Sequence, residues 1–179
     1  MDARHDYLIE QLIYVGESTI ESSNRSVNLA LIQPSKFLAW IVQYTYLIDN
    51  GDYFNYTDNY KYDVSGVEVG NSIINQETLI LNSQARVSLR NYQYFNFLQP
   101  LQHFSRGPDK GINIYSFSLF PEKIYTSGTC NMSQIDNVSI QLNLSHDVNI
   151  YNTTKFRAYS LCNNIYRILN GLGGLVFTR

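Results

Sequence analysis

The amino-acid sequence predicts an all-β fold, an antiparallel sandwich or jelly roll with long loops and at most one short helix. Apolar residues make up 44% of the 179 residues, and the 15 tyrosines and 9 phenylalanines favour pleated, half-buried surfaces. The apolar runs are short and are separated by Pro, Gly and Asn, which are turn residues. Because helical periodicity is almost absent, alternating strand and helix units are excluded. The length suits a single domain.

Three apolar runs in the first part of the chain are predicted to be strands. Residues 7–15 form the first, which ends at Gly16 and a polar stretch typical of a turn or loop. In the second, residues 27–31, apolar side chains alternate with small or polar ones. The third, residues 37–48, is long enough for a buried helix, but its β-branched and aromatic residues, Trp40 among them, favour a strand.

Residues 49–75 are predicted to form a long surface loop, since acids, asparagines and tyrosines replace the apolar pattern. Loops longer than about 12 to 15 residues usually carry recognition or are disordered. The tyrosines and aspartates of residues 49–63 could stack on and hydrogen-bond to a sugar, which leaves a glycan-binding module as an alternative function. Calcium binding is a weaker alternative, because the D-x-[DN]-x-[DN]-G register is missing. The acids concerned are Asp49, Asp52, Asp58 and Asp63.

One short helix is predicted after the apolar piece at residues 79–81. Either Asn82 or Ser83 could cap it, because their side chains can accept a hydrogen bond from the first helical turn. The helix would continue to Arg90. It is the only helix that the sequence predicts.

The remaining strands are predicted in the second half of the chain. Residues 112–119 alternate, with Tyr115, Phe117 and Leu119 on one face. Pro121 should end this strand because proline has no amide hydrogen for the ladder. The cleanest amphipathic alternation lies at residues 138–144, and three more strands are predicted at residues 156–161, 165–169 and 175–177.

No residue is predicted to act as a catalyst or to hold a metal or cofactor. His5, His103 and His146 are far apart in the sequence and lack the H-x-H or H-E-x-x-H spacing that places two ligands on one element. A hydrolase would need Cys130 to meet His103 or His146 in space, and a lone cysteine specifies such a pair only weakly. We therefore expect Cys130 to be a buried structural residue, and both Cys130 and Cys162 to be free thiols.

Charge and targeting signals restrict the function further. The formal charge is −2 and neither sign forms a block, so binding to nucleic acid is not predicted. The chain lacks the run of about 18 apolar residues that a membrane span needs, and its first residues carry acids in place of a signal-peptide core. Without such a signal, N-x-[ST] matches are interpreted as mostly accidental, with Asn55 the most plausible acceptor. The matches are Asn24, Asn55, Asn131, Asn137, Asn143 and Asn152.

Five segments resemble one known family. GINIYSFSLFPE, residues 111–122, followed by SGTCNMSQID, closely resembles a segment of the major capsid proteins of the nucleocytoplasmic large DNA viruses. The other segments occur in the same order as in that family. They are QPSKFLAWIVQ (33–43), LNSQAR (81–86), YFNFLQP (94–100) and YRILNGLGGLVF (166–177).

The resemblance implies a single eight-stranded jelly roll over residues 1–179, similar to the second, C-terminal barrel of family members that carry two barrels. It implies a structural protein of an icosahedral viral shell with no active site, present in the virion and assembled in the host cytoplasm. Other capsid chains would be its partners, in trimers whose six barrels form one tile. Residues 92–97, with Gln99 and Pro100, would meet neighbouring barrels. Because one barrel per chain cannot form that tile as a trimer, the chain would be a fragment, a truncated paralogue or a minor component.

Overall fold

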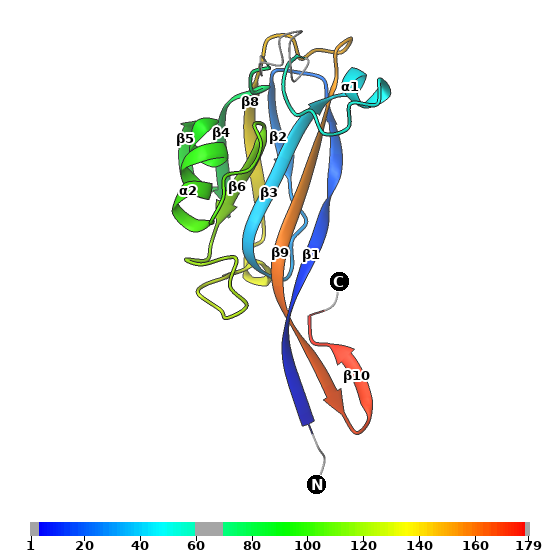
Figure 1. Ribbon diagram of the computed structural model, residues 1–179, viewed down its shortest axis with the longest axis vertical. Coiled ribbons are helices and arrows are strands. Elements are labelled where there is room, and N and C mark those ends of the chain that lie inside the picture. The colour runs from blue at the N-terminus through cyan, green and yellow to red at the C-terminus, as the bar shows by residue number, and fades with distance from the viewer. Residues whose placement is uncertain (1–3, 60–69, 178–179) are drawn as a thin grey trace.

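The computed structural model describes residues 4–59 and 70–177 as two antiparallel sheets packed face to face, the predicted sandwich (Figure 1). The first sheet has the spatial order β1 (Arg4–Ile20), β9 (Thr154–Leu169), β3 (Pro34–Tyr44) and β6 (Ile112–Ser116). The second has the order β2 (Asn24–Asn28), β8 (Val138–Leu144), β4 (Ile74–Leu81) and β5 (Gln84–Asn91). Two short strands, β7 (Cys130–Asn131) and β10 (Leu172–Leu175), pair with β3 and β9 in the first sheet.

The order of these strands is that of a jelly roll. Along the chain, β1, β3, β6 and β9 enter the first sheet, whereas β2, β4, β5 and β8 enter the second. Most neighbours within a sheet are therefore distant in sequence, as in a fold built from two Greek keys. The pairings are antiparallel throughout the described residues. The predicted fold class is confirmed, with the two short strands added to the eight.

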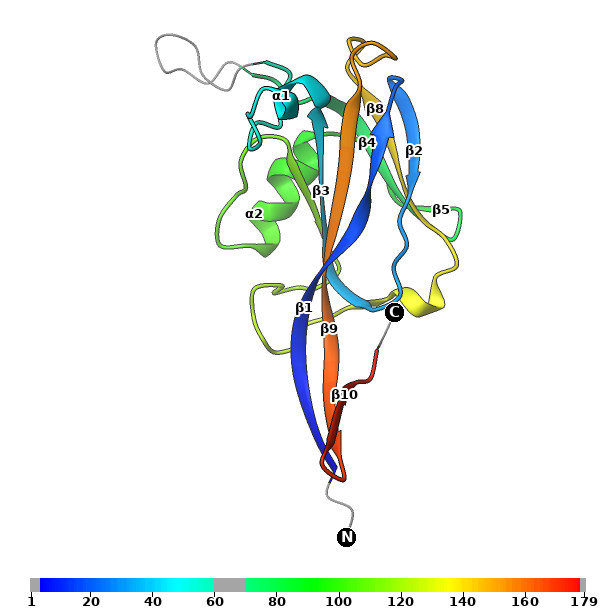
Figure 2. The same ribbon diagram turned by 90° about the vertical axis from the view of Figure 1, so that its right-hand side faces the viewer.

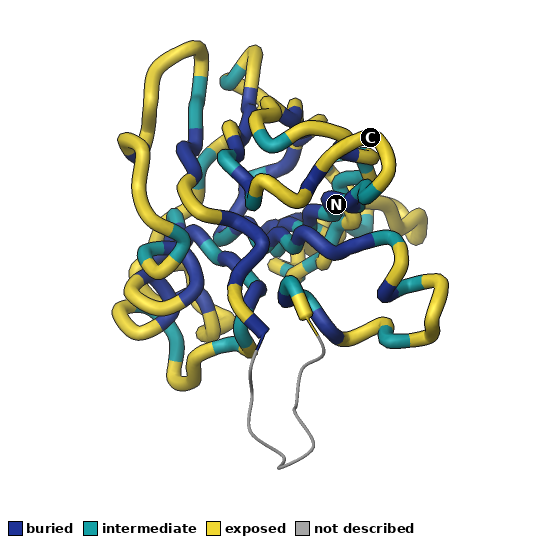
Figure 3. Tube along the Cα trace, turned by 90° about the horizontal axis from the view of Figure 1, so that it is seen from above, coloured by how far each residue is buried: buried dark blue, intermediate teal, exposed yellow. Residues whose placement is uncertain are grey.

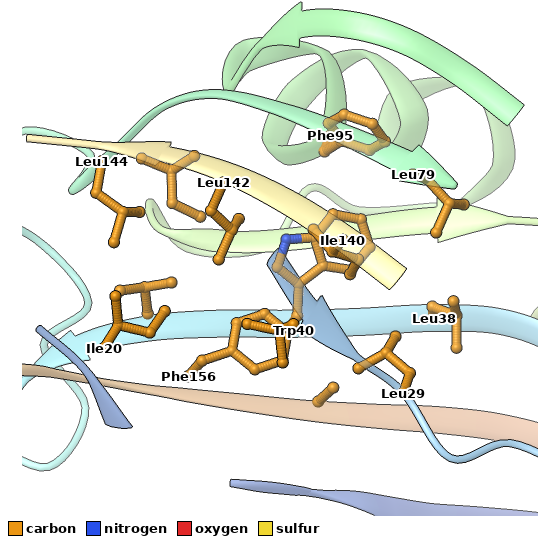
Figure 4. Packing of buried hydrophobic residues seen from close by; sticks show 14 of the residues in the cluster. Ile20, Leu29, Leu38, Trp40, Leu79, Phe95, Ile140, Leu142, Leu144 and Phe156 are labelled. Carbon is orange, nitrogen blue, oxygen red and sulfur yellow. The ribbon is translucent and has the colours of Figure 1, made fainter. Parts of the chain in front are cut away.

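The core lies between the two sheets and is built by the period-two alternation of their strands. Leu38 and Trp40 point inward from β3, and Phe156 does so from β9. Leu79 and Ile140 face them from the second sheet (Figure 4). Seen from above, the buried residues concentrate along the interior and the exposed ones along the outer loops (Figure 3).

The clearest amphipathic pattern in the sequence, residues 138–144, forms a strand as predicted. β8 alternates from Ile140 to Leu144, with its leucines inside and Gln141 exposed. The ambiguous third run is a strand as far as Tyr44. A single helical turn, α1 (Thr45–Asp49), follows it where the strand was expected to continue.

The helix predicted from Asn82 to Arg90 is wrong. Asn82 and Ser83 have positive φ angles of 49° and 64°, and they form the two-residue turn of a hairpin between β4 and β5. The helical segment lies later in the chain, where a π-helical turn, η1 (Tyr94–Leu98), runs directly into α2 (Gln99–His103). A 3-10 turn, η2 (Met132–Gln134), follows β7.

Several strand boundaries also differ from the prediction. β1 was expected to end at Gly16 but continues past it. Gly16 has a φ of 147° and lies where the register between β1 and β9 shifts, so the glycine forms a β-bulge within the strand. The two strands predicted at residues 156–169 are one long strand, β9. β6 ends at Ser116, before Leu119, because the next two amide groups turn to the carbonyl oxygen of Lys36.

β1 and β9 extend well beyond the sandwich, where β10 joins β9 to complete a narrow extension, which we call the stalk (Figures 1 and 2). Asp6 accepts hydrogen bonds from Arg167, across the ladder, and from Arg4. The tail after β10 folds back, and Asn164 holds the backbone of Phe177 through both its amide nitrogen (2.8 Å) and its oxygen (3.1 Å).

Candidate functional site

The YFNFLQP segment forms the helical segment η1–α2, which packs on β6 at one flank of the barrel. Phe95 enters the core, with its ring 5.2 Å from that of Trp40. Asn96 donates hydrogen bonds from Nδ2 to the carbonyl oxygens of Ile112 (2.7 Å) and Asp109 (3.1 Å). This segment is therefore fixed to the sheet by packing and by buried hydrogen bonds.

Only part of this segment is available to a neighbour. Gln99 and Pro100, predicted to meet another barrel, are buried, and Gln99 Oε1 accepts a hydrogen bond from the backbone of Ser116. Phe95 and Asn96 are buried as well. The expectation of an intermolecular contact is therefore wrong for these four residues. All four are buried, and the side-chain amides of Asn96 and Gln99 form hydrogen bonds with β6.

The outward side of the helical segment is apolar. Phe97 is 70% exposed, Leu101 is 76% exposed, and Leu98 lies beside them. These three residues, which we call the ridge, line a shallow hollow together with Gln93. No Asp, Glu, Lys or Arg occurs in residues 91–105. Of the ridge, the sequence predicted Phe97 as a contact but not Leu98 or Leu101. The four-residue spacing of Leu101 from Phe97 was a signal, since residues at that spacing share one face of a helix.

The other family-like segments brace the barrel internally. Arg86 of LNSQAR donates to the hydroxyl of Tyr115 in GINIYSFSLFPE at 3.2 Å, and the Tyr115 and Phe117 rings pack edge to face. The backbone nitrogen of Phe117 donates to the carbonyl oxygen of Lys36 in QPSKFLAWIVQ. The side-chain amide of Gln33 holds the backbone oxygen of Phe177. Segments far apart in sequence thus meet through side-chain and backbone hydrogen bonds.

The fully buried ammonium of Lys36 supports the same region from inside. It contacts the carboxylate of Glu10 on β1 and donates to the carbonyl oxygen of Lys123 at 2.6 Å. A buried charge requires such partners, since desolvation would otherwise be costly. Lys36 therefore links β1, β3 and the loop that follows Pro121.

The residues considered for catalysis lie in separate elements. His5 and His146 are exposed on β1 and in the turn after β8, whereas His103 ends α2 and its Nδ1 lies 3.2 Å from the carbonyl oxygen of Leu119. Burial raises the pKa of the partly buried Cys130 thiol, against the opposing effect of Arg86. Cys162 is buried and lies 3.1 Å from the hydroxyl of Ser160. Both cysteines are free thiols, as predicted.

Among residues 4–59 and 70–177, neither thiol forms a hydrogen bond with an imidazole. In the same ranges, no group of three or more His, Cys, Asp and Glu residues is placed to hold a metal ion. No helix in this part of the chain is both long and apolar enough to cross a bilayer.

Polar side chains of the loop after α1 form hydrogen bonds within the loop itself. Asn55 is 1% exposed; its Nδ2 donates a hydrogen bond to Asp52 (2.8 Å) and its Oδ1 accepts one from Thr57. The prediction that Asn55 is the most plausible glycosylation acceptor is therefore wrong, because its side-chain nitrogen is buried and bonded. Asp58 accepts a hydrogen bond from the backbone nitrogen of Asn71. Asp63, the fourth acid considered for calcium, lies outside the described residues.

Comparison with known proteins places these features in a family. Residues 1–174 match the family described as the large eukaryotic DNA virus major capsid protein. This chain belongs to that family. It is 40% identical, over 96% of its length, to the probable capsid protein 4 of Acanthamoeba polyphaga mimivirus, and 32% identical over 97% to the major capsid protein of Phaeocystis pouchetii virus. The chain spans 34% and 49% of the lengths of these two relatives.

A solved structure of a viral capsid also matches this chain. The quasi-atomic structure of the PBCV-1 virus capsid superimposes with a TM-score of 0.78 and 25% identity. The match covers 99% of this chain and 52% of the capsid chain. The resemblance drawn from the five segments is confirmed, whereas the glycan-binding alternative gains no support.

Proposed function

We propose that this chain is a structural subunit of the icosahedral capsid of a large DNA virus and that its function is to contact other capsid chains. The observation that carries the proposal is the ridge, an uncharged apolar surface held on a helical segment whose opposite side is locked into the core. Oligomer interfaces are enriched in such aromatic and aliphatic groups and depleted of charge. Membership of the capsid family supports this assignment.

The chain corresponds, in this proposal, to the C-terminal barrel of a two-barrel capsid protein, with residues 1–179 as one domain. Relatives two to three times as long support it, since the match leaves room for another barrel of similar size. A tile of six barrels, arranged as a trimer, would then need a second barrel from further coding sequence or from another chain. The coding sequence upstream of Met1 is the direct check on that arrangement.

The proposal includes no catalysis. The three histidines lie on separate elements and the raised pKa of Cys130 disfavours its thiolate, which is the reactive form. The expected location is the virion, with assembly in the host cytoplasm.

The experiment is to purify particles of the virus that encodes this chain and to search for it by mass spectrometry after chemical cross-linking. We expect the chain in the particles, cross-linked to other capsid chains. A matched control is an early viral enzyme of similar abundance in infected cells, which should be depleted during purification. Depletion of this chain together with that control would contradict the proposal.

A further inference from the structure

The sequence contains two Asn-Gly pairs, and the structure places them in different surroundings. Asn50–Gly51 follows the end of α1, whereas Asn170–Gly171 forms the turn between β9 and β10 at the end of the stalk (Figure 2). The side-chain amide of an asparagine is open to attack by the next backbone nitrogen when glycine follows, because glycine has no side chain to block the approach. Whether a pair can react then depends on whether that nitrogen and the amide are free.

The turn of the stalk leaves both reacting groups free. Asn170 and Gly171 have φ angles of 51° and 80°, and the pairing of Leu169 with Leu172 closes a two-residue hairpin around them. In such a hairpin the closing pair exchanges the ladder hydrogen bonds, so the amide nitrogen of the second loop residue is left outside the ladder. Both loop residues are exposed, and within residues 4–59 and 70–177 the Asn170 side chain has no hydrogen-bond partner.

The pair at α1 is held closed. The backbone nitrogen of Gly51 donates to the carbonyl oxygen of Ile48 at 3.0 Å, and that of Asn50 donates to the carbonyl oxygen of Tyr46 at 3.0 Å. The buried side chain of Leu47 fixes this helical turn to the barrel. The attacking nitrogen is therefore occupied, and a reaction at Asn50 would require the turn to unwind.

A second two-residue turn shows what protects an asparagine in this position. Asn82 has a φ of 49° in the hairpin between β4 and β5, close to the φ of Asn170. Its Oδ1 accepts hydrogen bonds from the backbone nitrogens of Asp136 (2.8 Å) and Asn137 (3.4 Å), and the residue after it is Ser83 in place of a glycine. The turn of the stalk has neither form of protection.

We infer that Asn170 is a site of spontaneous deamidation, which converts the turn of the stalk into an aspartyl or isoaspartyl link. The backbone nitrogen of Gly171 forms a bond to Cγ of Asn170 while the bond from Cγ to Nδ2 breaks, and Nδ2 leaves as ammonia with the proton of the Gly171 amide. Water then opens the resulting five-membered imide ring. Opening at Cγ gives aspartate, and opening at the main-chain carbonyl carbon gives isoaspartate. The inference does not depend on the proposed function.

An isoaspartyl link would loosen β10. It carries the main chain through the side chain of residue 170, which lengthens a turn whose geometry fits two ordinary residues. The pairing from Leu172 with Leu169 to Leu175 with Tyr166 would then lose its register. All four residues of β10 are exposed, so little packing would resist the change. The hydrogen bonds to the backbone of Phe177 would remain as the attachment of the tail.

The test is to incubate the folded chain at mildly alkaline pH and to follow the amides of residues 50 and 170 by mass spectrometry of peptides. We expect residue 170 to lose its amide at least about tenfold faster than residue 50, because Gly51 must first release its hydrogen bond and the helical turn must unwind. In urea, where both turns are open, the two rates should become similar. A smaller ratio in the folded chain, or the same ratio in urea, would overturn the inference.

Hydrogen exchange tests the effect on β10. In incubated chain that an isoaspartyl methyltransferase shows to contain isoaspartate, the amides of residues 172–175 should exchange faster than in fresh chain. Asn170→Gly is the matched control, since glycine accepts the positive φ of this turn and has no side-chain amide to lose. The same incubation should leave exchange in the variant unchanged. Unchanged exchange in the isoaspartyl form, or an equal increase in the variant, would overturn the loosening of β10.

Discussion

The indole nitrogen of Trp40 donates a hydrogen bond of 2.7 Å to Oε2 of Glu77, and this bond joins the two sheets through the core. Glu77 is fully buried, and within the described residues its Oε1 has no hydrogen-bond partner. Burial raises the pKa of this carboxyl to about 8, while the hydrogen bond from Trp40 opposes the rise. At neutral pH the group is therefore mainly a neutral acid within an apolar sandwich.

The raised pKa makes the stability of the fold depend on pH. Between pH 4.5 and about 8 the folded chain binds a proton at Glu77 that the unfolded chain has released, so this group's contribution falls as pH rises, by up to about 1.4 kcal/mol per pH unit. The Glu77→Gln variant keeps an oxygen that can accept the hydrogen bond from Trp40, but its side chain no longer titrates. We expect the variant to lose this part of the pH dependence in denaturant unfolding. The same slope in both proteins would contradict the assignment.

Lys36→Met should lower the free energy of unfolding by about 1 to 3 kcal/mol, because the carbonyl of Lys123 and the carboxylate of Glu10 both lose their buried partner. Urea unfolding at neutral pH measures the change. Glu10→Gln and the double variant complete a cycle, and the two single effects should add to more than the double effect. Strict additivity would show that the two groups act independently.

Gly111→Ala should be strongly destabilising. Gly111 opens the GINIYSFSLFPE segment with a φ of 87°, and a Cβ there would lie 2.3 Å from the backbone oxygen of Tyr56. Backbone strain and the displaced loop should together cost more than about 2 kcal/mol in thermal or denaturant unfolding. Gly107→Ala is the control, since a Cβ there meets nothing within 4 Å. Equal stability of the two variants would be evidence against the close approach.

Ser83→Gly should stabilise the chain by a few tenths of a kcal/mol to about 1 kcal/mol. Both turn residues have positive φ, and the change gives the Asn-Gly turn that such two-residue hairpins favour. Ser83→Val, which is β-branched and resists positive φ, should have the opposite effect. Denaturant midpoints measure both. A lower midpoint for the glycine variant would contradict the turn geometry.

The sequence predicted elements where one physical signal dominated. β8 has a polar residue at each outward position and an apolar one at each inward position, so its alternation was decisive. At Asn82 and Ser83 the same residue types serve helix caps and hairpin turns, and only pairing of β4 with β5 selects the turn. Gly16 was similarly ambiguous, because a glycine that can end a strand can also form a bulge.

The candidate site was predicted less completely than the fold. Phe97 was included among the expected contacts, but Gln99 and Pro100 are buried, and the hydrogen bond from Ser116 of β6 to Gln99 is a tertiary contact that no local pattern reveals. Which face of β1 and β9 meets the core depends on pairing between the two ends of the chain.

The backbone of Phe177 is fixed to the barrel by three side-chain hydrogen bonds. Asn164 accepts from its nitrogen and donates to its oxygen, and Gln33, at the start of the QPSKFLAWIVQ segment, also donates to that oxygen. Loss of Phe177 would remove two hydrogen bonds from the buried side-chain amide of Asn164 in β9, which would keep its bonds to Gln11 and to the backbone of Ile165. Because these hydrogen bonds hold the backbone of Phe177 against β9 and the start of β3, proteolysis at this residue should be slow while the barrel is intact.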